Sequence, residues 1–115
     1  MTQEQMIELA RRAVACKGWR WMPGMRWWTE DDRGRLDDFQ PEYMGRPLGA
    51  LPDLTDPATL GCLLALVREA WVDPYSHTLF DVDTWFVWGD APTDPFSTGS
   101  TEAEALVAAL EAAPQ

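Results

Sequence analysis

The segment DPATLGCLLALVREAW, residues 56–71, has the pattern of a helix that other elements must cover. Asp56 can cap its first turn, and Pro57 suits the first helical position, where a missing N–H costs nothing. The apolar residues extend round the helix instead of forming a single stripe, which is typical of a helix in a core. We therefore expect a central helix over residues 57–72 that is buried by the rest of the chain.

Gly61 lies inside this expected helix, where a glycine costs about 1 kcal/mol relative to alanine. We expect it to mark the close approach of another backbone, so that Gly61→Leu would destabilise the fold by about 1 to 3 kcal/mol through overpacking. If one side of the helix is open instead, Cys62, Leu66 and Ala70 would form a self-complementary patch and the protein would dimerise.

Two further helices are expected near the ends of the chain. Apolar residues recur at spacings of three and four from Met6 to Cys16, which predicts an amphipathic helix ended by Gly18. Near the other end, Thr101 and Glu104 have the spacing of a capping box, and an apolar stripe follows them. Both helices have one apolar face, which we expect to pack on the central helix or on a sheet.

Aromatic and β-branched runs between the helices predict short strands. The expected strands are 19–22, 25–30, 35–39, 76–80 and 84–88, with a hairpin turn over 31–34 and no regular structure over 40–55. The simplest arrangement is a single α+β domain over residues 1–115, with three helices against a small antiparallel or mixed sheet of three to five short strands.

The chain has 115 residues and a formal net charge of −10. This charge argues against a nucleic-acid backbone or an anionic membrane as the main partner, because both need a basic surface, and it leaves a basic partner open. Cys16 and Cys62 lie in different helical segments without a CxxC spacing, so we expect free thiols. The first residues match neither a secretion signal nor a transit peptide, which favours the cytoplasm.

Candidate catalytic and metal-binding patterns are weak. His77, Asp81 and Asp83 form an H-x3-D-x-D pattern, but a catalytic zinc usually takes three protein ligands from a better-defined set. Paired aspartates such as Asp31 and Asp32 stand beside turns, where solvated carboxylates are normal. The chain has no GxxxxGK[ST], GxGxxG or GxSxG motif. We therefore expect no metal, no cofactor and no enzymatic activity.

The chain has seven tryptophans, which cannot all face inward. Trp27 and Trp28 are neighbours on an expected strand and must therefore point to opposite faces. A partly exposed indole beside an arginine would form a cation–π platform for a protein or a planar ligand. The residues expected to contact a partner or ligand are Arg20, Arg26, Trp28, Arg33, Arg35, Tyr43, Asp81 and Asp83.

Three stretches carry a resemblance to known proteins: GWRWMPGM at 18–25, LPDLTDPATLGCLLALVREAW at 51–71 and TEAEALVAALEAA at 101–113. Together with the tryptophan-bearing run at 84–88, they resemble small uncharacterised proteins encoded in bacteriophage and prophage genomes. The chain is also similar, more loosely, to phage proteins described as α-β-α sandwich domains. The resemblance implies an origin in a mobile element and an accessory role, and it implies no catalytic residues.

We therefore expect a non-enzymatic accessory protein that binds a host or phage protein, for example as an inhibitor of host defence. It would act in the host cytoplasm as a monomer or small homo-oligomer, without direct contact to nucleic acid or membrane. Three alternatives stay open: a sponge for a nucleotide signal, an acidic mimic of DNA that occupies the nucleic-acid channel of a defence protein, and an enzyme of unknown reaction.

Overall fold

The computed structural model describes residues 2–36, 49–90 and 94–114, and it confirms the predicted α+β class. Its helices are α1 (Gln3–Ala15), α2 (Pro57–Ala70) and α3 (Glu102–Ala112). Its strands are β1 (Arg26–Trp28), β2 (Arg33–Arg35), β3 (Leu51–Pro52), β4 (His77–Asp81), β5 (Thr84–Trp88) and β6 (Ser97–Gly99). These strands form two antiparallel sheets, in the orders β2-β1-β3 and β4-β5-β6, instead of the single sheet expected.

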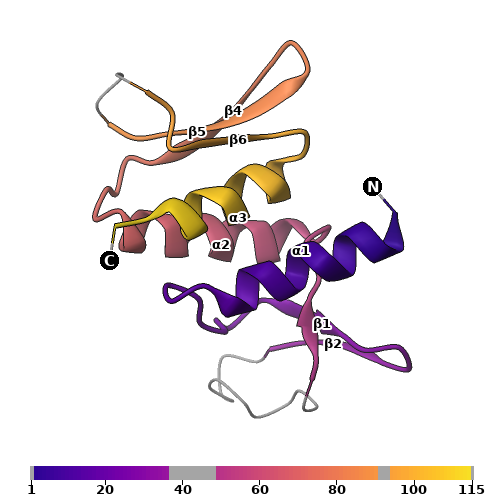
Figure 1. Ribbon diagram of the computed structural model, residues 1–115. Coiled ribbons are helices and arrows are strands. Elements are labelled where there is room, and N and C mark those ends of the chain that lie inside the picture. Colours follow the sequence, from indigo (N-terminus) through magenta and orange to yellow (C-terminus); the bar gives the residue numbers. More distant parts are fainter. Residues whose placement is uncertain (1, 37–48, 91–93, 115) are drawn as a thin grey trace.

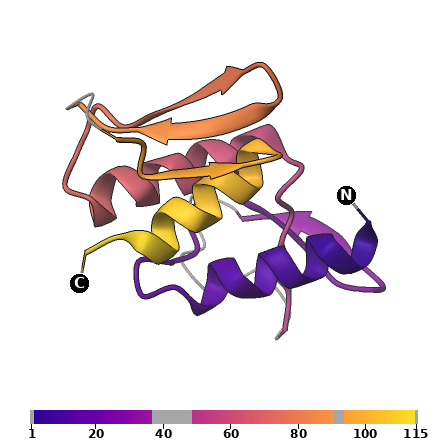
Figure 2. The same cartoon turned by 45° about the horizontal axis from the view of Figure 1, so that its top comes forward.

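The helices lie between the two sheets, with β1 and β2 at one end of the molecule and β4 to β6 at the other (Figure 1). Seen from a second direction, α3 lies directly against the β4-β5-β6 sheet, and α1 lies on the side of β1 and β2 (Figure 2). The sheets are therefore the outer layers and the helices the inner one, which is the reverse of an α-β-α order. Each sheet accordingly has one face on the helices and one face turned outward.

Helix α2 forms the centre of the core, as its sequence predicts. Leu63, Leu66 and Val67 are fully buried, and Asp56 caps the first turn by accepting the backbone N–H of Thr59 at 3.0 Å. The expectation for Gly61 was wrong, because Gly61 is exposed and a Cβ added there would meet nothing within 4 Å. No contact among the described residues therefore requires a glycine at this position.

Local capping fixes the other two helices. Thr2 and Gln5 form a capping box at the start of α1, and Thr101 accepts the N–H of Glu104 at the start of α3. In a full capping box the Glu104 carboxylate would accept the backbone N–H of Thr101. Here it accepts the Ser100 hydroxyl instead, at 2.9 Å. These side chains satisfy N–H groups that a helix leaves unpaired at its first turn.

The strand expected at 19–22 does not form, and aromatic side chains pack this segment onto the core. The rings of Trp19 and Trp21 pack edge to face with centroids 5.5 Å apart, and both side chains lie partly buried against the core. This segment is therefore held by side-chain contacts without joining a sheet. In the stretch expected to be irregular, β3 pairs with β1, while residues 40–48 lie outside the described part of the chain.

The first hairpin is shifted relative to its prediction. Trp28 pairs with Arg33, so the turn covers residues 29–32, and Gly34 sits in β2 opposite Trp27 instead of in the turn. A Cβ on Gly34 would lie 2.5 Å from the Trp27 ring, which shows that glycine is needed there for close approach. The buried indole of Trp27 fills that space, and its neighbour Trp28 points to the other face, as predicted.

Trp71 joins α2, α3 and the second sheet at the end of α2. Its indole N–H donates to the Ala109 carbonyl oxygen at 2.8 Å, and its ring stacks on Phe96 with centroids 3.8 Å apart.

On β5, the alternation of a strand turns Val87 inward, where it is fully buried, and turns Phe86 and Trp88 outward. These contacts fix which face of the β4-β5-β6 sheet remains uncovered.

Candidate functional site

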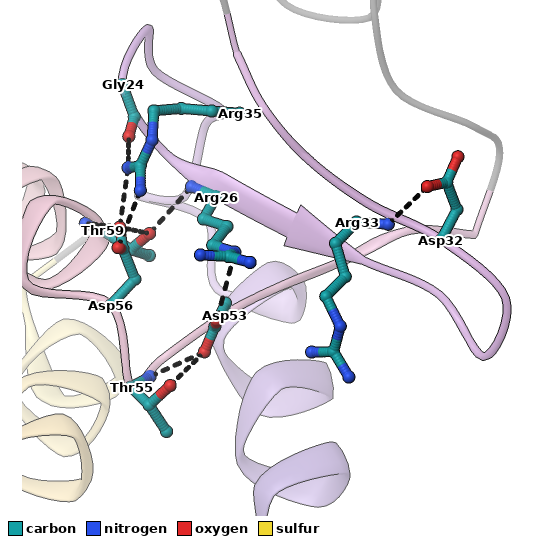
Figure 3. Close-up of polar contacts among 9 residues, drawn as sticks. All are labelled: Gly24, Arg26, Asp32, Arg33, Arg35, Asp53, Thr55, Asp56 and Thr59. Atoms are coloured by element: carbon teal, nitrogen blue, oxygen red, sulfur yellow. Dashed lines mark hydrogen bonds and ion pairs between the residues drawn. The ribbon is translucent and has the colours of Figure 1, made fainter.

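Four of the residues expected to bind a partner lie together on the β2-β1-β3 sheet: Arg26, Trp28, Arg33 and Arg35. Figure 3 shows the three arginines and the carboxylates around them. Arg20 lies outside this sheet and pairs with Glu69 near the end of α2, with an N–O distance of 2.6 Å. Tyr43 lies outside the described residues. Four of the predicted residues therefore share one sheet, and Arg20 lies elsewhere.

Arg35 stabilises the start of α2 and is not free for a ligand. Its guanidinium donates to both carboxylate oxygens of Asp56, at 2.8 and 2.9 Å, and to the Gly24 carbonyl oxygen at 2.7 Å (Figure 3). The hydrogen bonds from Arg35, and after them those from Thr59, hold the pKa of Asp56 well below its usual range. This group ties the β1–β2 hairpin to the helix that forms the core.

Arg26 is also engaged within the fold. Its Nε lies 3.7 Å from a carboxylate oxygen of Asp53, a longer contact than the one between Arg35 and Asp56. The Arg26 backbone N–H donates to the Thr59 hydroxyl at 2.9 Å, which adds a second link between β1 and α2. Such pairs between partly exposed groups contribute little stability individually, and their main effect here is to position β1 on α2.

Arg33 differs from these arginines. Among the described residues its guanidinium has no hydrogen-bond or ion-pair partner, and it extends away from the sheet (Figure 3). It lines an open hollow of about 390 Å³ together with Trp28 and residues of α1 and the β3–α2 loop. Trp28 also lines a second hollow of about 350 Å³, next to Arg11. A half-buried indole thus lies beside a guanidinium that has no partner among the described residues.

Asp81 and Asp83 lie at the opposite end of the molecule, at the tip of the β4–β5 hairpin. Asp81 ends β4 and pairs with Thr84, so the turn consists of Val82 and Asp83. Val82 has a φ of 60° and is 89% exposed, an unusual combination for a β-branched residue. The two aspartates therefore belong to a different surface from the arginines.

The outer face of the β4-β5-β6 sheet contains apolar residues that the sequence analysis missed. Leu79 is 50% exposed and pairs with Phe86, whose ring stacks beside Trp88 with centroids 6.1 Å apart. The alternation within 84–88 is the signal that could have found them, because it places Phe86 and Trp88 on the face opposite the buried Val87. Deciding which of the two faces is covered required the positions of the helices.

The groups considered for catalysis are spread apart. His77 and Asp81 stand at opposite ends of β4, about 13 Å apart at strand spacing. No three His, Cys, Asp or Glu side chains of residues 2–36, 49–90 and 94–114 gather closely enough to hold a metal ion. Cys16 and Cys62 are free thiols, and desolvation raises the pKa of both, which lowers their reactivity.

Comparisons with protein-family models, curated proteins and solved structures found no match to this chain. Across the described ranges, no helix has the length and apolar character needed to cross a membrane. The molecule thus has two candidate binding surfaces: the arginine-rich sheet with Trp28 and Arg33, and the acidic and apolar sheet at the other end.

Proposed function

We propose that this protein is a non-enzymatic accessory protein of a phage or prophage, which binds a protein partner in the host cytoplasm. The observation that most strongly supports the binding of a protein partner is the uncovered outer face of the β4-β5-β6 sheet, where Leu79, Phe86 and Trp88 lie side by side. Helix α3 covers the opposite face, and no described element lies over this one (Figures 1 and 2). Exposed apolar clusters on small proteins commonly mark binding surfaces.

The charge around this face favours a basic partner. From Glu69 to Gln115 the sequence contains no lysine or arginine, so every formal charge in the second sheet and in α3 is negative, apart from any proton on His77. Asp81, Asp83 and Asp90 are all exposed at the ends of β4 and β5. An apolar centre with a rim of one charge binds best to an apolar patch surrounded by the opposite charge. The partner would therefore present lysines or arginines around an apolar contact.

Affinity capture from a bacterial lysate with Phe86→Thr and Trp28→Thr variants tests this proposal. Threonine suits a strand, so both variants should keep the fold, and each removes one ring from a different surface. We expect one protein to be retained by the wild type and by Trp28→Thr, and to be lost with Phe86→Thr. Its binding, remeasured with the purified partner, should weaken at least about tenfold with Asp83→Lys, which is about 1.4 kcal/mol.

Equal capture by the wild type and Phe86→Thr would contradict the proposal, as would no specific capture at micromolar protein concentration. Competition by duplex DNA gives a further distinction. If DNA displaces the captured partner, the acidic face acts as a mimic of DNA on a nucleic-acid-binding protein. If DNA has no effect, the apolar contact on Phe86 and Trp88 is the main determinant.

A second candidate function is supported by Arg33 and Trp28. Their hollow of about 390 Å³ falls within the size range of small-molecule sites, and it offers an indole and an unengaged guanidinium. A planar anion such as a nucleotide would stack on the indole and pair with the guanidinium. Calorimetric titration with a nucleotide panel tests this: binding that Arg33→Gln abolishes would support the site, and no heat change at millimolar ligand would exclude it.

A further inference from the structure

Exposed large apolar side chains gather along β4 and its two ends. Of the five described residues of this kind, only Val72 lies elsewhere. The other four are Tyr75, Leu79, Phe80 and Val82, which are 68%, 50%, 51% and 89% exposed. Leu79 lies on the outer face of the sheet beside Phe86, whereas its neighbour Phe80 lies on the opposite face, with its ring 5.3 Å from that of Trp85. β4 therefore exposes apolar side chains on both faces at the edge of the sheet, which is typical of an edge that pairs with another strand.

The backbone of β4 is also unprotected. It pairs with β5 on one side, and no strand of the described residues pairs with its other side. In an antiparallel ladder every second residue turns its N–H and C=O groups away from the existing partner, so part of the β4 backbone is free to accept another strand. Native edge strands are usually blocked by lysine, proline or a bulge, and HTLFD has none of these.

We propose that β4 pairs antiparallel with β4 of a second copy of this chain, about a two-fold axis at Leu79. This arrangement places Leu79 opposite Leu79 of the partner subunit, and Thr78 opposite Phe80 of the partner subunit. It also places His77 opposite Asp81 of the partner subunit, twice by symmetry. The sequence HTLFD is thus complementary to itself when it is read in opposite directions.

The geometry at His77 suits this pairing. Its Nδ1 lies 3.0 Å from the Tyr75 carbonyl oxygen, and a carbonyl can only accept, so the proton on this ring atom is engaged. The other ring nitrogen, Nε2, has no described partner, and it can donate to Asp81 of the partner subunit when the ring carries a second proton. Asp81 is exposed and has no hydrogen-bond or ion-pair partner among the described side chains.

The register follows from the charges and from the length of the strand. With the axis at Leu79, every residue of β4 has a partner. An axis at Thr78 or Phe80 would leave strand residues unpaired, and would place Asp81 opposite Tyr75 or Leu79 of the partner subunit instead of a histidine. The resulting six-stranded sheet joins two copies of the outer apolar face through the paired Leu79 side chains.

Sedimentation velocity over protein concentrations up to about 1 mM tests the dimer. We expect the average mass to rise from 13.0 kDa toward twice that value. Leu79→Lys places two like charges at the axis and should weaken the dimer at least about tenfold. The matched control, Thr98→Lys on the exposed outer face of β6, should leave self-association unchanged.

A charge exchange tests the register itself. Asp81→Lys places a cation opposite His77 and should weaken the dimer at least about tenfold, whereas Asp81→Lys with His77→Asp should restore it to within about threefold of the wild type. Thermal unfolding checks that each variant is folded. A monomer at about 1 mM, a dimer insensitive to Leu79→Lys, or a double variant no tighter than Asp81→Lys would overturn the proposal. If β4 instead pairs with a strand of a different protein, the purified chain alone would stay a monomer at about 1 mM.

Discussion

Asp56 accepts hydrogen bonds from Arg35 and from both the backbone and the hydroxyl of Thr59, so one carboxylate caps a helix and anchors a hairpin. Its pKa in the folded protein is lowered, mainly by Arg35, below the unfolded value near about 4. A lowered folded pKa means that the stabilisation is fully present above the unfolded value and is lost as the pH falls toward the folded one.

Asp56→Asn should keep the capping oxygen and lose the charge. We expect the unfolding free energy to fall by about 1 kcal/mol at neutral pH. The loss is smaller than for a fully buried ion pair, because the Arg35 side chain is partly exposed to solvent. Below about pH 4 the difference from the wild type should shrink. Urea unfolding across the acid range measures both effects, with the exposed Asp90→Asn as control, and a difference that stays constant with pH would refute the role given to Asp56.

At the scale of elements, α2 has a glycine that its packing does not require. Since a Cβ at Gly61 meets nothing within 4 Å, Gly61→Ala should stabilise the protein by about 0.5 to 1 kcal/mol through helix propensity. Chemical denaturation measures the change, and Gly34→Ala is the contrasting variant, since it should destabilise by collision with the Trp27 ring. A loss of stability in Gly61→Ala would mean that another chain covers this side of α2.

The β4–β5 hairpin holds Val82 at a backbone conformation that glycine adopts more easily. The side chain is 89% exposed, so removing it sacrifices few contacts. Val82→Gly should therefore raise the unfolding free energy by about 1 kcal/mol, and Val82→Ala by less, because alanine keeps a Cβ at positive φ. Thermal unfolding of the three proteins gives the order, and a destabilised Val82→Gly would show that the valine makes contacts in solution.

The sequence was most informative where the controlling interactions are local. Asp56, Pro57 and Thr101 predicted helix starts correctly, because capping involves residues only a few positions apart. Strand pairing was less predictable, since alternation identifies a strand without naming its partner. The division into two sheets and the place of Gly34 opposite Trp27 depend on contacts between distant segments.

The same limit applied to the candidate site. The sequence indicated Trp28 and the arginines, but it could not show that Arg26 and Arg35 are engaged by Asp53 and Asp56 while Arg33 extends free of described partners. The sequence also indicated Asp81 and Asp83, but it did not indicate the exposed apolar face that lies beside them. Whether Phe86 and Trp88 are covered depends on which side of the sheet α3 occupies, and strand periodicity carries no such information.

At the scale of the whole molecule, charge is unevenly placed along an axis that runs from one sheet to the other. All nine lysines and arginines precede Glu69, and three of the arginines lie on β1 and β2, while the β4-β5-β6 sheet at the far end has none (Figure 1). The protein therefore has a permanent electric dipole. A basic partner diffusing nearby would turn the molecule before contact, bringing the negative end forward, so salt should slow association far more than it speeds dissociation.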